Sequence, residues 1–162
     1  MSKVQVSESR VIDATCERIF ALLADPTMHA SIDGTGMLRD AIDGNTIRAV
    51  GDEFYVAMVH WDRGNYIKTN VVLEFELNRR LVWAPIKDTP EKPTEKSNFN
   101  GTPDYFWGWA LRPLEDGTTE VTEFFDCTNA SEHLRSYIKD GEFWRLSMIN
   151  SLMNLERLAT TN

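Results

Sequence analysis

The chain has 162 residues, of which 42% are hydrophobic and 26% charged, as is usual for one globular domain with a sizeable core. Its formal net charge of −8 argues against nucleic acid and anionic membranes as partners, because both select for clusters of Lys and Arg. The N-terminus lacks the apolar stretch of a secretory signal, and no apolar run approaches the ~18 residues of a membrane span. We therefore expect a single cytoplasmic domain over residues 1–162.

The N-terminal part of the chain predicts one strand followed by two short helices. Val4 to Ile12 alternates apolar and polar residues, which is typical of a strand. A helix capped by Asp13 or Thr15 follows and ends at Asp25-Pro26, because the residue before a proline is pushed out of the helical region. Thr27 to Ile32 is the candidate for the second helix.

Residues 37–127 are dominated by segments rich in Val, Ile, Thr and aromatic residues, separated by Gly, Asn and Asp turns. Strands joined by such tight turns pair in antiparallel fashion, since parallel pairing needs long crossovers. The expected strands are Met37 to Ile42, Asp52 to Trp61, Tyr66 to Glu76, Leu81 to Pro85, Tyr105 to Leu114 and Thr118 to Cys127.

Two features of this strand region leave alternatives open. The polar segment Lys87 to Pro103 is long for a loop in a compact domain, so it is either a lid over a site or a mobile connection. In the strand Tyr66 to Glu76 the set that includes Ile67 and Phe75 is the more apolar and is expected to face inward, with Asn70 and Glu74 outside. A bulge would reverse this phase.

The stretch Glu142 to Ala159 predicts a long amphipathic helix, after a shorter one at Ser131 to Asp140. So large an apolar face must be buried, and the sheet is the only large partner. Because a single helix cannot fill the concave side of a curved sheet, we expect an internal cavity. The predicted fold is α+β: a curved antiparallel sheet of about seven strands wrapped around a long C-terminal helix, with two short helices after the first strand.

Several short motifs occur in an order that is similar to a known superfamily. They are Glu17-Arg18-Ile19-Phe20 with Asp25-Pro26, Val50-Gly51-Asp52-Glu53-Phe54, Arg79-Arg80-Leu81-Val82-Trp83, Trp109 to Pro113 and Gly117 to Thr122. Together they resemble the START/Bet v 1-like superfamily (SRPBCC), nearest to bacterial proteins labelled polyketide cyclase/dehydrase or lipid-transport-like. The resemblance covers nearly the whole chain and implies a helix-grip fold with a hydrophobic cavity, but no single reaction. Thr15, where proline is usual, and the insert Lys87 to Pro103 depart from the pattern.

Glu123 is the first candidate for acid–base chemistry. It shares a strand face with Val121 and Phe125, and this more apolar face is expected to point inward. A carboxyl group that faces an apolar cavity has a raised pKa and can donate or accept a proton. A bulged strand, or a cation at the cavity rim that pairs with Glu123, would instead make the residue structural.

His60 is the second candidate, as a general base or as a polar anchor for a ligand. It shares a face with Phe54 and Met58, so it points inward if Phe54 does. The alternative is a histidine at a strand end that bonds to backbone or water. His60 and Glu123 can act as a pair only if they lie within reach of each other.

The interior of the predicted cavity is rich in aromatic residues, which suit flat or polycyclic ligands. An ordinary packed core is the alternative for any single one of them. The expected lining residues are Phe54, Met58, Tyr66, Trp83, Trp107, Trp109, Phe125, Trp144, Met148 and Ser151.

Several chemistries lack their motifs. The chain has no GxSxG, HExxH, P-loop or GxGxxG sequence, and its histidines show no metal-ligand spacing, so we expect neither a metal nor a cofactor. Cys16 and Cys127 form no CxxC motif, which leaves two buried thiols or a disulfide between them.

Three functions remain open. The first is binding of a small hydrophobic or aromatic ligand, lipid- or polyketide-like, in the cavity between sheet and helix. The second is a cofactor-independent polyketide cyclase, aromatase or dehydratase with Glu123 and His60 as the acid–base pair. The third is a protein-interaction domain. The pattern does not decide whether the protein is an enzyme, which ligand it takes or its oligomeric state.

Overall fold

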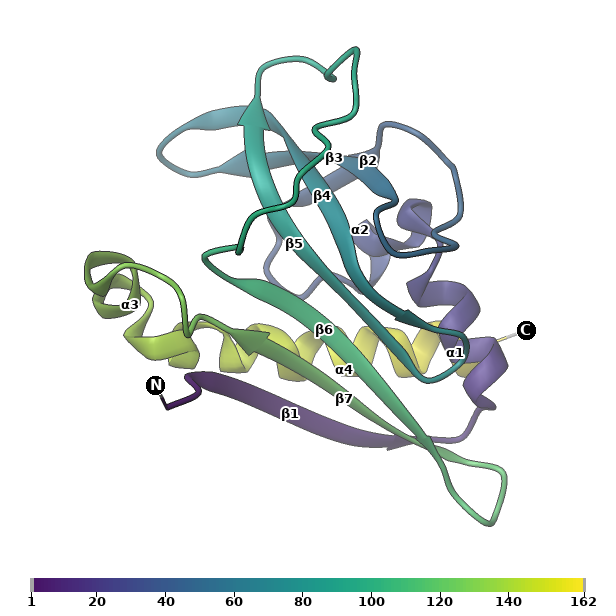
Figure 1. Cartoon of the computed structure of the whole chain (residues 1–162). Helices are drawn as coiled ribbons and strands as arrows, with labels where there is room; N and C mark the ends of the chain where they lie inside the picture. The colour runs from purple at the N-terminus through teal and green to yellow at the C-terminus, as the bar shows by residue number, and fades with distance from the viewer. Residues whose placement is uncertain (1, 162) are drawn as a thin grey trace.

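The computed structural model describes residues 2–161 and confirms the predicted α+β fold, with one curved antiparallel sheet and a long C-terminal helix (Figure 1). The order of the strands in the sheet is β1-β7-β6-β5-β4-β3-β2. The strands are β1 (Gln5–Ile12), β2 (Leu38–Ala41), β3 (Glu53–His60), β4 (Gly64–Glu76), β5 (Arg80–Thr89), β6 (Phe106–Pro113) and β7 (Thr119–Asp126).

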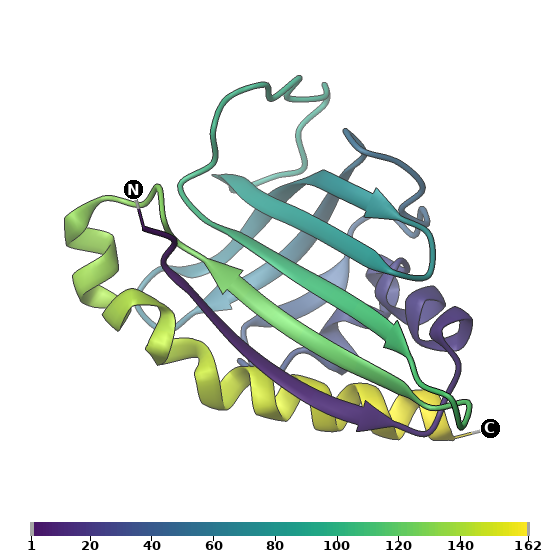
Figure 2. The same ribbon diagram turned by 60° about the horizontal axis from the view of Figure 1, so that its bottom comes forward.

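The helices lie at the concave side of the sheet, where β1 runs beside the longest of them (Figure 2). Of the two candidate caps of the first helix, Thr15 is the one that accepts a hydrogen bond from a helical N–H, that of Arg18. The helices are α1 (Cys16–Leu23), the 3-10 helix η1 (Pro26–Met28), α2 (His29–Ile32), α3 (Glu132–Tyr137), the 3-10 helix η2 (Lys139–Trp144) and α4 (Arg145–Thr160).

The terminal helix begins at Arg145 and not at Glu142 as the apolar spacing predicts. The backbone at Asp140 and Gly141 has positive φ angles of 55° and 96°, which interrupts the helix. A Cβ atom on Gly141 would lie 3.0 Å from the side chain of Val6, so the chain passes close to the sheet at this point. Trp144 therefore precedes α4 and belongs to η2.

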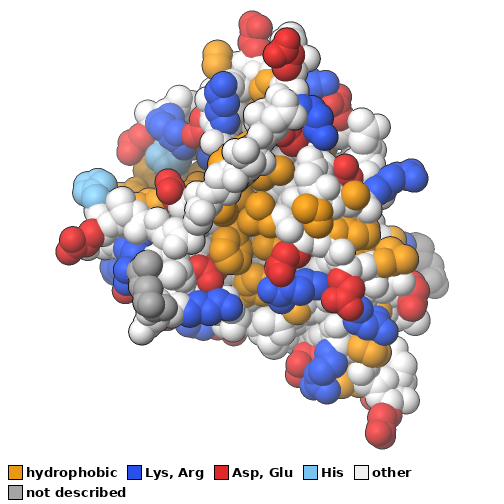
Figure 3. Space-filling model, viewed as in Figure 1, with side chains coloured by type: hydrophobic (Ala, Val, Ile, Leu, Met, Phe, Trp, Pro, Cys, Tyr) orange, Lys and Arg blue, Asp and Glu red, His pale blue; other side chains and the backbone are white. Residues whose placement is uncertain are grey.

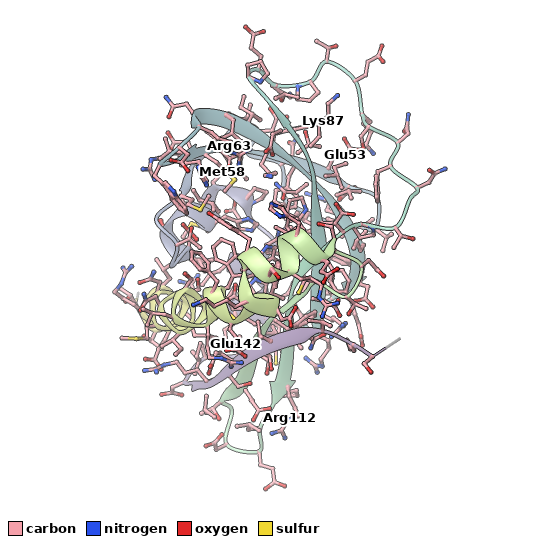
Figure 4. The ribbon with its side chains drawn as sticks, turned by 90° about the vertical axis from the view of Figure 1, so that its left-hand side faces the viewer. Glu53, Met58, Arg63, Lys87, Arg112 and Glu142 are labelled. Atoms are coloured by element: carbon pink, nitrogen blue, oxygen red, sulfur yellow. The ribbon has the colours of Figure 1, made fainter. Side chains whose placement is uncertain are left out.

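The polar segment after Pro85 divides between the sheet and an outer loop. Residues 87–89 extend β5 beyond its predicted end, and the remainder crosses the convex face, on the side of the sheet away from α4 (Figures 1 and 4). The Ser97 N–H donates to the Glu53 carboxylate at 3.0 Å, and Lys92 pairs with Asp43 at 2.7 Å. This loop therefore covers the outer face and not the space between sheet and α4.

A small apolar layer lies on the convex face, where hydrophobic side chains gather beside the loop (Figure 3). Val82, Gly108 and Phe124 are neighbours in the strand register, and the Phe124 ring lies over Gly108. The Arg80 guanidinium covers that ring at 4.7 Å from its centroid. Phe124 is thus buried on the face opposite to Glu123.

The phase predicted for β4 is wrong in its first half. The β4–β5 register shifts between Thr69 and Asn70 and again between Val72 and Glu74. Asn70, which the alternation places outside, is 5% exposed and lies on the concave side, whereas Phe75 beyond the second shift packs against the core as expected. Bulges of this kind leave no mark in the hydrophobic pattern.

The buried face of α4 belongs to two apolar clusters. Leu152, Leu155 and Ala159 lie in the larger one, with the inner faces of α1 and the sheet. Met148 lies in a smaller one with Phe125. The C-terminal half of α4 therefore packs against α1 and the sheet, and the N-terminal half borders the space beside them.

Gly34 sets the distance between α4 and the loop after α2. A Cβ atom there would lie 2.2 Å from the Ser147 carbonyl oxygen and 2.8 Å from the Ser151 nitrogen, both of them backbone atoms. We expect Gly34→Ala to lower the free energy of unfolding by about 1–3 kcal/mol, because the loop must move away from the helix. Urea denaturation measures this.

The matched control is Gly44→Ala, whose added Cβ would meet its nearest neighbour at an ordinary 3.6 Å. It should stay within about 0.5 kcal/mol of the wild type. Equal stabilities for the two variants would contradict the close approach at Gly34.

Candidate ligand-binding cavity

A cavity of about 270 Å³ lies between the concave face of the sheet and the segments α2, α3, η2 and α4. Its volume approaches the lower end of the range of small-molecule sites. All of the residues expected from the sequence line it: Phe54, Met58, His60, Tyr66, Trp83, Trp107, Trp109, Glu123, Phe125, Trp144, Met148 and Ser151.

Glu123 is the buried acid of this cavity. Its side chain points inward from β7, the residue is 7% exposed, and Oε2 has no hydrogen-bond partner within residues 2–161. Burial raises the pKa of Glu123 well above its usual value, and the negative charge of Asp33 raises it further. Burial therefore favours the neutral, protonated form of Glu123.

The loop after α2 forms one wall of the cavity close to Glu123. The Asp33 carboxylate accepts hydrogen bonds from the backbone N–H groups of Thr35, Gly36 and Leu38 at 2.9–3.3 Å, and this holds it in place. The Gly34 N–H donates to the Ser151 hydroxyl at 2.9 Å. Ser151 therefore joins α4 to this loop.

His29 lines the same cavity and was missed as a candidate from the sequence. It is 6% exposed, its Nε2 donates to the Leu23 carbonyl at 2.7 Å, and its ring stacks on Trp83 with centroids 5.1 Å apart. Burial lowers the pKa of His29, so the imidazole is neutral at pH 7. The sequence held no signal for this role, because a single histidine in a four-residue helix has no diagnostic spacing.

His60 lies at the rim of the cavity. Its ring stacks on Trp61 at 4.1 Å, and its Nδ1 accepts from the Asp62 N–H at 3.1 Å. This matches the alternative of a strand-end histidine that bonds to backbone.

The sheet register does not bring His60 next to Glu123. Glu123 belongs to a row of residues that are paired across neighbouring strands. The row continues with Trp109 on β6, Leu81 on β5 and Phe75 on β4. His60 pairs with Gly64 on β4, which is 75 − 64 = 11 residues from that row. At about 3.3 Å per residue this is on the order of 35 Å along the strand.

The open end of the cavity carries charged and aromatic side chains. Arg63 and Lys68 both pair with Asp88, and the Arg63 guanidinium lies 4.5 Å from the centroid of the Tyr66 ring. In Figure 4 Met58 and Arg63 lie on one side of α3, and Glu142 lies on the other. The exposed rings of Trp61, Tyr137 and Phe143 border this end.

The described residues do not meet the requirements of a metal site, a disulfide or a membrane-spanning helix. Nowhere in residues 2–161 do three or more His, Cys, Asp or Glu side chains gather so that they could hold a metal ion. Cys16 and Cys127 are both free and buried, so the disulfide alternative is not realised. No helix in the described part of the chain has the length and hydropathy to cross a membrane.

Comparison with other sequences gives distant relatives of unestablished function. No protein-family model matches the chain. It is 28% identical over 137 residues to the uncharacterized protein Rv0088 of Mycobacterium tuberculosis, a match that covers 85% of this chain and 51% of the relative. The chain thus spans about half the length of the curated relatives it matches.

Solved structures share the fold. Protein NE0264 from Nitrosomonas europaea has a TM-score of 0.66 and 16% identity, over 95% of this chain and 92% of that one. A protein from Arthrobacter aurescens, solved by NMR, has a TM-score of 0.68 and 16% identity, over 97% and 86%. Protein Ms6760 from Mycobacterium smegmatis has a TM-score of 0.64 and 14% identity, over 98% and 92%. Such identities establish a common sheet-and-helix fold and leave function open.

The buried carboxyl group predicts a specific pH dependence of stability. Above the ordinary Glu pKa the unfolded state has lost this proton, while folded Glu123 keeps it. The stability of the wild type relative to Glu123→Gln should therefore fall as the pH rises, by up to ~1.4 kcal/mol per pH unit. The fall should end once the pH passes the raised pKa of Glu123. Urea denaturation of both proteins between about pH 4 and pH 9 checks this.

Glu120→Gln is the matched control, because Glu120 lies on the other face of β7 beside Arg112. A constant difference between wild type and Glu123→Gln across this range would show that Glu123 is charged in the folded protein.

Proposed function

We propose that the protein is a member of the START/Bet v 1-like superfamily that binds a small hydrophobic or aromatic ligand in the cavity between the sheet and α4. The observation that carries this proposal is the set of polar atoms left without partners among the apolar walls. Glu123 Oε2 and Trp144 Nε1 are both buried and unbonded among the described residues. Such atoms are costly to bury, so a ligand that bonds to them would stabilise the fold.

The walls of the cavity support an aromatic ligand. Phe54, His29 and Trp83 contact one another through edge-to-face and stacked rings, with centroids 5.1–5.6 Å apart. Trp107 and Trp144 meet edge to face at 5.6 Å. Flat walls of this kind offer large apolar contact at a small cost in side-chain entropy.

A second candidate function is cofactor-independent proton transfer, such as cyclisation or dehydration of a poly-β-keto substrate. The observation that favours it is the burial of the Glu123 carboxyl group in an apolar cavity, which raises its pKa, since a raised pKa suits a general acid near pH 7. The position of His60 at the rim does not support its role as the partner of Glu123.

Blocking the cavity tests ligand binding. The neutral dye N-phenyl-1-naphthylamine should bind the wild type in a 1:1 complex with increased fluorescence. Ser147 lines the cavity, so Ser147→Trp places a large side chain in the space that the dye would occupy. This substitution should raise the dissociation constant of the dye about tenfold or more, which corresponds to a loss of ~1.4 kcal/mol of binding free energy.

Met153→Trp is the control, because Met153 is 50% exposed on α4. It should leave the dye affinity unchanged. Equal effects of the two substitutions, or no binding to the wild type, would contradict an accessible ligand cavity.

The enzymatic candidate makes a different prediction for Glu123→Gln. Loss of the acidic proton should lower turnover of a poly-β-keto substrate by about 10²-fold or more, because general acid catalysis contributes that much. Substrate affinity should change little, since glutamine keeps the size of the side chain. Steady-state kinetics separates the two effects, and His60→Ala in the same assay tests His60 independently. Unchanged turnover in Glu123→Gln would exclude this mechanism.

A further inference from the structure

The charged groups that line the cavity already have ion-pair or hydrogen-bond partners within the protein. Within residues 2–161, Arg63 and Lys68 are the only lining arginine and lysine, and both pair with Asp88, at 2.8 and 2.5 Å. The Asp33 carboxylate accepts several hydrogen bonds from its own loop. A charged ligand would therefore have to displace an existing partner to gain a counter-ion.

The carboxylate beside Glu123 in the sheet is neutralised as well. Glu8 on β1 is the register neighbour of Glu123, and its carboxylate accepts from Arg145 at 2.9 Å. Arg145 also binds Glu142 at the start of α4. Neither Arg145 nor Glu142 lines the cavity, so this ion pair offers no free charge to a ligand.

Glu123 and His29 are the buried titratable pair of the cavity wall on which the inference rests. In the protonated form that burial favours, Glu123 has one O–H donor and spare acceptor capacity. The Leu23 carbonyl can only accept, so His29 Nε2 must carry the imidazole proton, and Nδ1 is left as an acceptor. Both side chains are more than nine-tenths buried, and both line the cavity.

We propose that the ligand presents an uncharged hydroxyl group to this pair, which accepts a hydrogen bond from Glu123 and donates one to His29 Nδ1, and that the cavity discriminates against anions and cations of similar size. The inference rests on the proposed ligand-binding function and specifies the chemistry of the ligand. The ligand class is a neutral aromatic or polycyclic alcohol or phenol. Trp144 Nε1, a buried donor without a partner, would serve a second oxygen of such a ligand.

The negative charge of Asp33 acts in the same direction on Glu123. It raises the pKa of Glu123 beyond the effect of burial, which favours the neutral, protonated carboxyl group. At His29 burial outweighs the opposing charges of Asp25 and Asp33 and lowers the pKa, so the imidazole keeps its acceptor. A ligand carboxylate placed here would face the Asp33 charge in a medium that screens poorly. A ligand ammonium would lose its hydration with no free carboxylate to replace it, because Asp33 is already saturated by its loop.

A series of naphthalene probes of one size tests the proposal. The four probes are 2-naphthol, 2-methylnaphthalene, 2-naphthoate and 2-naphthylmethylammonium, and tryptophan fluorescence titration of the full chain gives each dissociation constant. We expect 2-naphthol to bind about tenfold more tightly than 2-methylnaphthalene, as one buried hydrogen bond allows, and both ions to bind more weakly than 2-methylnaphthalene.

Two substitutions assign the preference to Glu123. Glu123→Leu removes the donor and should equalise the affinities for 2-naphthol and 2-methylnaphthalene. Glu123→Gln keeps an uncharged donor and should retain the preference for 2-naphthol within about threefold. A thermal melt shows that each variant is folded. The affinities of the wild type for the four probes test the neutral-ligand preference even if neither variant folds.

The outcomes separate the inference from the function on which it rests. Tightest binding of 2-naphthoate or of the ammonium probe, or an unchanged preference in Glu123→Leu, would overturn the neutral-ligand proposal and leave ligand binding intact. If none of the four probes binds the wild type, the proposed function itself fails, and the inference fails with it.

Discussion

The structure depends on one geometric constraint, which is that one long helix and the short helices α1 and α2 must cover the concave face of a seven-stranded sheet. Leu152 and Leu155 in the C-terminal half of α4 are almost fully buried against the sheet and α1. The N-terminal half starts after a break at Gly141 and stands beside unfilled space. Stability and the cavity therefore come from different halves of the same helix.

Polar side chains in the cavity wall work against the stability of the fold. Glu123 lies where an apolar residue would pack without desolvation cost, and its Oε2 has no partner among the described residues. His29, by contrast, is buried with a hydrogen-bond partner, since one ring nitrogen is bonded to the Leu23 carbonyl and the ring is stacked on Trp83. A buried acid without a partner costs stability, which makes Glu123 a candidate for a functional residue.

The location of polar groups around the cavity could be predicted only in part. Alternation along β7 correctly places Glu123 on the inner face, because that strand has no bulge. The same reasoning misplaces Asn70, since the register shift between Val72 and Glu74 adds one residue to β4 and reverses its phase. His29 lies in a four-residue helix, where periodicity carries no information. The polar insert after β5 has the composition of a lid, yet Ser97 binds it to Glu53 on the outer face.

The sequence by itself determined the fold class, the order of the elements and the inner face of most strands, because these follow from local hydrophobic period and turn chemistry. Only the tertiary structure decided which polar groups line the same cavity. Glu123 and His29 are 94 residues apart, as 123 − 29 shows, and they line one cavity because α2 and β7 pack on the same side of the sheet. The shape of this shared cavity depends on bulges, on the close approach at Gly34 and on the break at Gly141, none of which appears as a periodic pattern in the sequence.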